Sequence, residues 1–211
     1  MFSVPVGAFA ETFVVRLGER DLGTMTFQRD GDAMRLRVSL NNTPLNLFDG
    51  TLDASSRPVR MANGDIRRQL LALSDTTRKN REISVIFDGD VVTDVVVNPA
   101  SEKTPLSVAE NVPIAVIDPV RAFGQIVSGQ QCPGLMQIYD GRRAVRLTTM
   151  QSTLSGDIVR CDVAYRVIAG PGHLSPLSFK NATVALFYDA QRFANLTVTA
   201  GPFSITFVRS P

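Results

Sequence analysis

The sequence predicts an all-β protein, mainly antiparallel, whose strongly curved sheet forms an open or closed barrel with one short helix packed against or inside it. Most of the 211 residues fall into segments in which apolar and polar residues alternate with a period of two. Turn residues separate these segments at short intervals, which is typical of barrels and sandwiches. Residues 118–129 instead carry a helix start and a helical period.

The first strands are predicted as a meander over residues 12–40. Phe13, Val15 and Leu17 alternate with other residues, and the same period returns after the turns at 18–23 and 30–32. Because each segment places polar residues on one side, we expect an antiparallel sheet with one solvated face.

The middle of the chain is less uniform. Residues 45–52 continue the strand pattern, with a bulge expected at the Asp-Gly pair. Residues 57–61 contain a proline and are expected to form a short edge strand or a loop. Residues 66–74 favour a helix by composition but a strand by their position between turns, and we predict a strand. A hairpin is predicted over 83–97, and a long polar loop with two prolines over 98–111.

The predicted helix begins with a good cap. Asp118 suits the N-cap, and Pro119 suits the first helical position because its missing N–H would be unpaired there. Val120, Phe123 and Val127 follow on one face, and a glycine can close the last turn. A short helix is stable only when such a stripe packs on something, here the strands.

The C-terminal part returns to the strand period. Residues 136–148 predict a hairpin around an Asp-Gly turn, and residues 159–167 show the clearest alternation, with Cys161 on the apolar face. Further strands are predicted between 184 and 207. We find no internal repeat or composition shift, so we predict one barrel-like domain over residues 1–211, of which residues 1–10 could be a flexible segment.

Part of this stretch resembles a bacterial family. Asp118-Pro119, Cys132, the run at 139–143 (Tyr-Asp-Gly-Arg-Arg) and the run at 161–165 (Cys-Asp-Val-Ala-Tyr), followed by Ala-Gly at 169–170, are similar in order to exported proteins catalogued as domain of unknown function 3108. The similarity is close over about 50 residues, and elsewhere only the strand rhythm agrees. The resemblance implies export to the periplasm and a β-rich fold, and it implies no known activity.

Two cysteines, Cys132 and Cys161, are compatible with one disulfide. The alternative is two reduced cysteines that pack as small apolar side chains. The oxidising compartment implied by the resemblance favours the disulfide. A bridge closing a loop of this length would stabilise the fold by about 3–4 kcal/mol in the chain-entropy model.

Composition excludes several classes of protein. A formal net charge of +2 argues neither for nucleic acid nor for an anionic membrane as a partner, and we expect no nucleic acid. No apolar run approaches the ~18 residues of a transmembrane helix. Residues 8–10 (Ala-Phe-Ala) have the form of a signal cleavage site but no basic leader precedes them. Either a signal peptide is absent from this sequence or the protein had none, and the family resemblance implies the first, a periplasmic protein.

The sequence gives little support for catalysis, and an enzyme is the less favoured interpretation. His173 is the single histidine, lies in a Pro/Gly-rich loop without a nucleophile motif, and is expected at the surface. No spacing suits zinc, and no glycine-rich phosphate loop precedes a helix. We expect no metal and no cofactor. The basic clusters, Arg142-Arg143 with Arg146 and Arg78-Lys79 with Arg81, are either solvated hairpin tips or anion sites.

Two functions from different classes fit these observations. The favoured one is a non-enzymatic periplasmic protein that binds an apolar or amphipathic cell-envelope molecule, such as a lipid, inside the barrel, as half-open lipoprotein carriers do. The residues predicted to bind the ligand are Val120, Phe123, Val127, Arg142 and Arg143. The alternative is a structural or protein-interaction module of the envelope without a small ligand. The sequence leaves the ligand and the oligomeric state open.

Overall fold

The computed structural model describes residues 9–46, 49–77, 80–173 and 178–210, and most of them lie in one antiparallel sheet of 13 strands. The strands are β1 (Phe9–Leu17), β2 (Arg20–Asp30), β3 (Ala33–Leu40), β4 (Gly50–Arg60), β5 (Ile66–Thr76), β6 (Asn80–Asp88), β7 (Val91–Asn98), β8 (Met136–Tyr139), β9 (Ala144–Ser155), β10 (Ile158–Ala169), β11 (Asn181–Asp189), β12 (Arg192–Ala200) and β13 (Phe203–Arg209). The helices are α1 (Pro119–Ser128) and the 3₁₀ turns η1 (Pro44–Asn46), η2 (Ala100–Glu102), η3 (Pro105–Ser107) and η4 (Ala109–Asn111).

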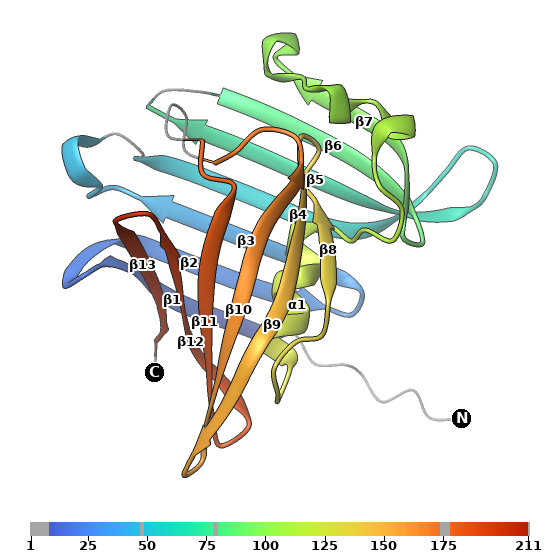
Figure 1. The fold of residues 1–211 in the computed structure, drawn as a ribbon. Helices are drawn as coiled ribbons and strands as arrows, with labels where there is room; N and C mark the ends of the chain where they lie inside the picture. Colours follow the sequence, from blue (N-terminus) through green and yellow to red (C-terminus); the bar gives the residue numbers. More distant parts are fainter. Residues whose placement is uncertain (1–8, 47–48, 78–79, 174–177, 211) are drawn as a thin grey trace, which may run out of the picture.

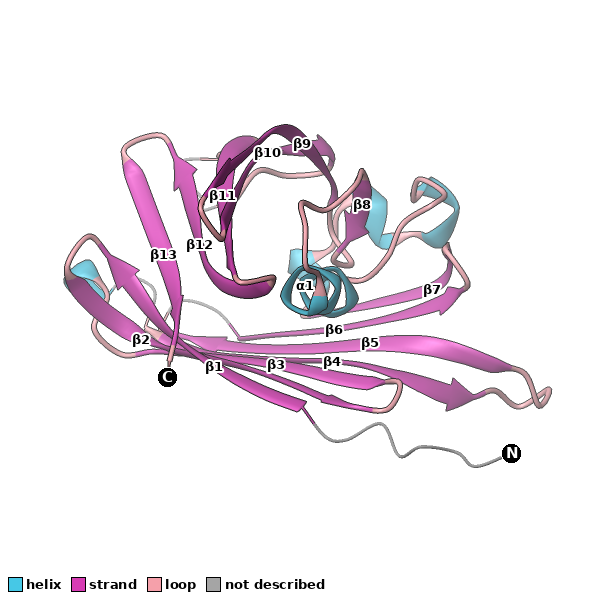
Figure 2. Cartoon of the chain, turned by 90° about the horizontal axis from the view of Figure 1, so that it is seen from below, coloured by secondary structure: helices cyan, strands magenta, loops and turns pink. Residues whose placement is uncertain are grey.

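The sheet is strongly curved but not closed, which confirms the predicted fold class. Its strand order runs from β7 back to β1, then from β13 back to β8, so the first and last strands pair in its middle. The strands β1–β7 form one side of the curl and β9–β12 the opposite side, with α1 between them (Figure 1, Figure 2). The outermost strands β7 and β8 are not paired with each other.

The segment 99–117 runs between these two outermost strands. The turns η2, η3 and η4 contact β7, and Ile117 forms a parallel bridge with Ile138 of β8. The N–H of Val116 donates to the carbonyl of Asp90 at 3.0 Å. The predicted long loop is therefore a series of 3₁₀ turns that covers the edge of β7.

Two predictions for the middle of the chain, the strand over residues 66–74 and the edge position of the proline-containing segment, are confirmed. The strand predicted over 66–74 is confirmed as β5. Pro58 lies near the end of β4, where β5 still pairs but β3 has already ended opposite Ser56, so this end is an edge as predicted.

The strand predicted over residues 45–52 is wrong at its start. Residues 44–46 form η1, and residues 47–48 lie outside the described residues. No register shift occurs at Gly50, so the predicted bulge is also wrong. Gly50 has φ +145°, and a Cβ there would lie 2.2 Å from the carbonyl oxygen of Asp75, which explains the glycine without a bulge.

The helix forms where its cap predicts. Asp118 Oδ1 accepts the N–H of Arg121 at 2.8 Å, and Pro119 occupies the first position. Gly124 weakens a helix interior, yet a Cβ there would lie 3.0 Å from both Phe27 and Met34. The glycine therefore lets the helix approach the N-terminal strands closely.

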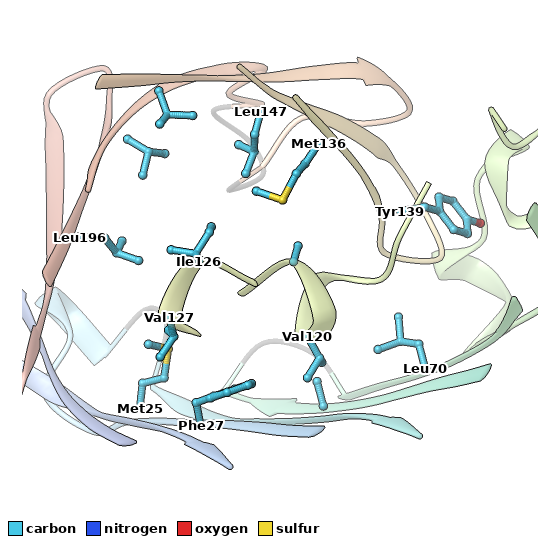
Figure 3. Close-up of a cluster of buried hydrophobic side chains, with 14 of the residues drawn as sticks. Met25, Phe27, Leu70, Val120, Ile126, Val127, Met136, Tyr139, Leu147 and Leu196 are labelled. Atoms are coloured by element: carbon cyan, nitrogen blue, oxygen red, sulfur yellow. The ribbon is translucent and has the colours of Figure 1, made fainter. Parts of the chain in front are cut away.

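The core lies on both sides of α1. Val127 lies near Met25 on the N-terminal strands, whereas Ile126 points to the other side, near Leu196 (Figure 3). Phe123 makes edge-to-face contacts with Phe13, Phe27 and Phe193, which come from both halves of the sheet. The helix thus joins the two sides of the curl.

Cys132 and Cys161 form a disulfide with a Cα–Cα distance of 5.5 Å, which confirms the predicted pairing. Cys161 is fully buried on the inner face of β10, and Cys132 belongs to the loop between α1 and β8. The bridge therefore ties the exit of the helix to the C-terminal half of the sheet. No helix among the described residues is long and apolar enough to cross a membrane.

Candidate ligand-binding site

The helix residues predicted to bind a ligand lie in the packed core. Val120 and Val127 are buried, and Phe123 is half-buried within its aromatic cluster. Their role toward a ligand is not tested by these contacts and stays a prediction.

Arg142 fastens the Asp-Gly turn to the 3₁₀ segment. Its Nε donates to the carbonyl of Glu102 at 2.6 Å, and its Nη2 lies 3.2 Å from the Glu102 carboxylate, which also pairs with Arg81 at 2.5 Å. Thr104 donates its hydroxyl to the carbonyl of Arg142 at 2.8 Å. Burial lowers the pKa of Arg142 most, and the neighbouring charge of Arg81 adds to this. Of the second predicted basic cluster, residues 78–79 lie outside the described residues.

Arg143 reaches the opposite way, toward the loop of His173. Its Nη1 donates to the carbonyl of Gly172 at 3.0 Å, and its Nε lies 3.1 Å from Asp140 Oδ2, although this N–H does not point at that oxygen. The end of β10 approaches the same turn closely, because a Cβ on Gly170 would lie 2.6 Å from the carbonyl oxygen of Arg142. The basic pair therefore positions backbone on both sides of the turn.

An apolar hollow of about 280 Å³, called here the inner hollow, lies beside this loop. It is lined by Tyr165, His173, Phe179, Asn181, Ala182, Val198, Ala200, Phe203 and Ile205. Ala182 belongs to the same alternating set of β11 as the buried Val184 and Leu186, so its side chain lies on the inner face of the sheet. Two of the inward positions are alanines, and their small side chains leave space.

A tyrosine–histidine pair supplies the polar contact of the inner hollow. Tyr165 Oη lies 2.5 Å from His173 Nε2, and the two rings meet edge to face. Burial raises the pKa of Tyr165. Burial, followed by the charge of Arg143, lowers the pKa of His173 to about 4. Both side chains are therefore uncharged at neutral pH, and the pair adds no charge to the inner hollow.

His173 is half-buried, so its predicted place at the surface is wrong. The backbone of His173 pairs with Phe179 through two hydrogen bonds of 2.8 and 2.9 Å, which fold the loop back over the strands. Residues 174–177 of the loop lie outside the described residues. The hydrogen-bond partner of the imidazole is Tyr165 and not a carboxylate, and the described residues contain no group of His, Cys, Asp or Glu that could hold a metal ion.

Sequence reasoning missed the inner hollow as a site. The alternation in β10 places Tyr165 on the inner face, and small residues at inward positions of β11 and β12 were a readable signal of space. The position of His173 was not readable, because it depends on the contact between Arg143 and the carbonyl of Gly172.

Comparisons with known proteins give little further information. No model of a protein family matches the chain, and no curated protein matches it. Among solved structures it is similar to the crystal structure of a beta-barrel-like protein of domain of unknown function DUF1849 from Brucella abortus, with 14% sequence identity, 99% of this chain and 98% of that chain covered, and a TM-score of 0.49. The resemblance to domain of unknown function 3108 therefore stays a prediction.

Proposed function

We propose that the protein is a non-enzymatic periplasmic protein, related to domain of unknown function 3108, that holds an apolar or amphipathic cell-envelope molecule by its hydrocarbon part. The observation that carries the proposal is the apolar inner hollow on the concave face of β10–β13. The Cys132–Cys161 disulfide supports the compartment, because disulfides persist in oxidising environments.

The size and polarity of the inner hollow favour a hydrocarbon chain as its occupant. Ligand pockets span about 300–1,000 Å³, so a hollow of about 280 Å³ suits one chain rather than a whole lipid. The uncharged Tyr165–His173 pair offers hydrogen bonding without the desolvation cost of a buried charge. A polar headgroup would therefore remain outside.

Neighbouring inward residues extend this apolar surface. Strand β13 pairs Ile205 of the inner hollow with Leu17 of β1, and places Phe207 opposite Val15. Leu17 and Phe207 are only partly buried, as are Leu36, Val38 and Leu40 on the inner face of β3. A longer chain could therefore continue along apolar side chains.

The five residues predicted from the sequence to bind a ligand do not line the inner hollow, but they hold the elements around it. Val120, Phe123 and Val127 hold α1 in the core, so the hollow lies beside a fixed scaffold. Arg143 holds the loop that presents His173, and Arg142 holds the turn that carries Arg143. We propose that these residues act on the ligand through the shape of the site.

Filling the inner hollow tests the proposal. Binding of a fluorescent long-chain fatty acid is titrated against the wild type, Ala200→Phe and Thr199→Phe. The first variant places a ring in the hollow, whereas the second places the same ring on the exposed outer face of β12. We expect Ala200→Phe to weaken binding by about tenfold or more and Thr199→Phe to leave it unchanged.

Two outcomes would contradict the proposal. If the wild type binds no fatty acid and lipid extraction of the purified protein yields nothing, the interaction module without a ligand is the better description. If both variants bind equally well, the ligand occupies another place.

A further inference from the structure

A second pocket, of about 540 Å³, lies where the start of α1 meets strands β4–β6. Two of its lining residues are Arg68 of β5 and Arg121 in the first turn of α1. Arg68 belongs to the same alternating set of β5 as the buried Leu70, so its side chain lies on the inner face of the sheet. We call this space between Arg68 and Arg121 the arginine pocket.

The two arginines of the pocket are close enough to repel each other. Burial lowers the pKa of Arg68 most, and the charge of Arg121 lowers it further. Nη1 of Arg68 donates to the carbonyl of Asp32 at 2.9 Å and to the hydroxyl of Ser56 at 3.4 Å. Arg68 is therefore held in place by uncharged acceptors, which leave its positive charge without an ion pair.

Another pair of neighbouring arginines in this protein shares a carboxylate. Arg81 and Arg142 both pair with Glu102, at 2.5 and 3.2 Å. In the part of the chain that the structure describes, no carboxylate forms an ion pair with Arg68 or Arg121, and the side chain of Arg121 makes no hydrogen bond. The arginine pocket therefore offers two guanidinium groups to an anion from outside the chain.

The carboxylates around the pocket do not replace such an anion. Asp32 and Asp90 line the pocket but are exposed to water, which screens their charge. Asp118 is fully buried and already accepts the backbone N–H of Arg121 and a serine hydroxyl. Because Arg68 and Arg121 are only partly exposed, their charges are screened less and dominate the interaction with an anion between them.

We propose that the arginine pocket binds a phosphate group. A guanidinium presents a planar fork of N–H donors, and one fork satisfies the two oxygens of a carboxylate. A phosphate has more acceptor oxygens and can accept from two forks at once. A free phosphate ion and a phosphate-bearing headgroup share this chemistry, and the volume of the pocket admits either.

The inference does not rest on the proposed ligand of the inner hollow. The arginine pocket and the inner hollow share no lining residue. A fatty acid contains no phosphate, and a small phosphate contains no hydrocarbon chain. Fatty-acid binding therefore tests the inner hollow, and binding of a small phosphate tests the arginine pocket.

Two variants that each remove one positive charge test the pocket. Binding of inorganic phosphate and of glycerol phosphate is measured by isothermal titration calorimetry on the wild type, Arg121→Gln and Arg57→Gln. The Arg121 side chain makes no hydrogen bond that the first change would break. Arg57 is exposed on β4 and does not line the pocket, so the second variant is the matched control. Circular dichroism checks that both variants are folded.

We expect the wild type to bind at least one of the two phosphates, Arg121→Gln to weaken this binding by about tenfold or more, and Arg57→Gln to leave it unchanged. Tighter binding of glycerol phosphate would assign the pocket to a headgroup, and tighter binding of inorganic phosphate would assign it to the free ion. A wild type that binds neither phosphate would overturn the proposal, as would two variants that weaken binding equally.

Discussion

The inner face of one sheet is packed beside α1 and hollow beside β10–β13. Around the helix, the apolar rings of Phe13, Phe27, Phe123 and Phe193 pack edge to face. In the inner hollow, the corresponding inward positions include alanines and the Tyr165–His173 pair. Strands with the same two-residue period therefore enclose either a filled core or a pocket, depending on the size of their inward side chains and on whether a helix covers them.

The two regions also treat a buried titratable group differently. Asp118 is fully buried at the start of α1, where the hydroxyl of Ser56 and the N–H of Arg121 both donate to its carboxylate. Burial raises the pKa of Asp118 despite these bonds. Burial, followed by the charge of Arg143, lowers the pKa of His173, whose imidazole meets the Tyr165 hydroxyl beside the inner hollow. The Asp118 carboxylate therefore stabilises the start of α1, whereas the His173 imidazole lines the inner hollow.

Truncating one aromatic ring in each region gives the largest expected difference. Phe27→Ala removes a ring that is 1% exposed and should cost about 3–5 kcal/mol of unfolding free energy, because a cavity remains in the core. Phe203→Ala removes a rim residue that is 40% exposed and should cost about 1 kcal/mol or less. Urea unfolding measures both, and equal costs would end the distinction between a packed and a hollow region.

Breaking the disulfide tests the link between the two regions. Replacing Cys132 and Cys161 by alanine opens a loop with a sequence separation of 29 and should lower the unfolding free energy by about 3–4 kcal/mol. The expected change lies mostly in the unfolded state, so fatty-acid binding at low temperature should persist. Loss of binding in a folded double variant would mean that the bridge shapes the inner hollow itself.

Acidification tests the neutral histidine. The pKa of His173 falls from 6.5 to about 4 on folding. Between these two pH values the imidazole is mostly protonated in the unfolded chain and mostly neutral in the folded protein. Unfolding should therefore become easier as the pH falls from about 6.5 to 4.5, by up to about 2–3 kcal/mol from this group.

The control for this prediction is His173→Gln, whose stability is compared with that of the wild type at each pH. Asp118 acts in the opposite sense, because its raised pKa makes the folded protein bind a proton earlier, and it is common to both proteins. A difference between the two proteins that does not change between pH 6.5 and 4.5 would contradict the lowered pKa of His173.

Some features of the fold could be predicted from the sequence, because they depend on residues that are neighbours in the chain. The strand period identified β5 against its helical composition, and Asp118-Pro119 marked the start of α1 to the residue. The prediction over residues 45–52 failed at its start, where Thr77, from outside the segment, donates its hydroxyl to the carbonyl of Asn46 at 3.1 Å. The hydroxyl and N–H of Thr43 also donate to Asp49, at 2.6 and 2.8 Å.

The sequence by itself determined most strands, the helix α1 and the inward side chains, because alternation and capping act between residues a few positions apart. Only the tertiary structure decided that β1 pairs with β13 and that the sheet stays open. It also decided that Arg143 brings the loop of His173 to Tyr165 beside an inner hollow. These outcomes depend on contacts between distant segments and on the space left after packing, and neither leaves a periodic signal in the chain.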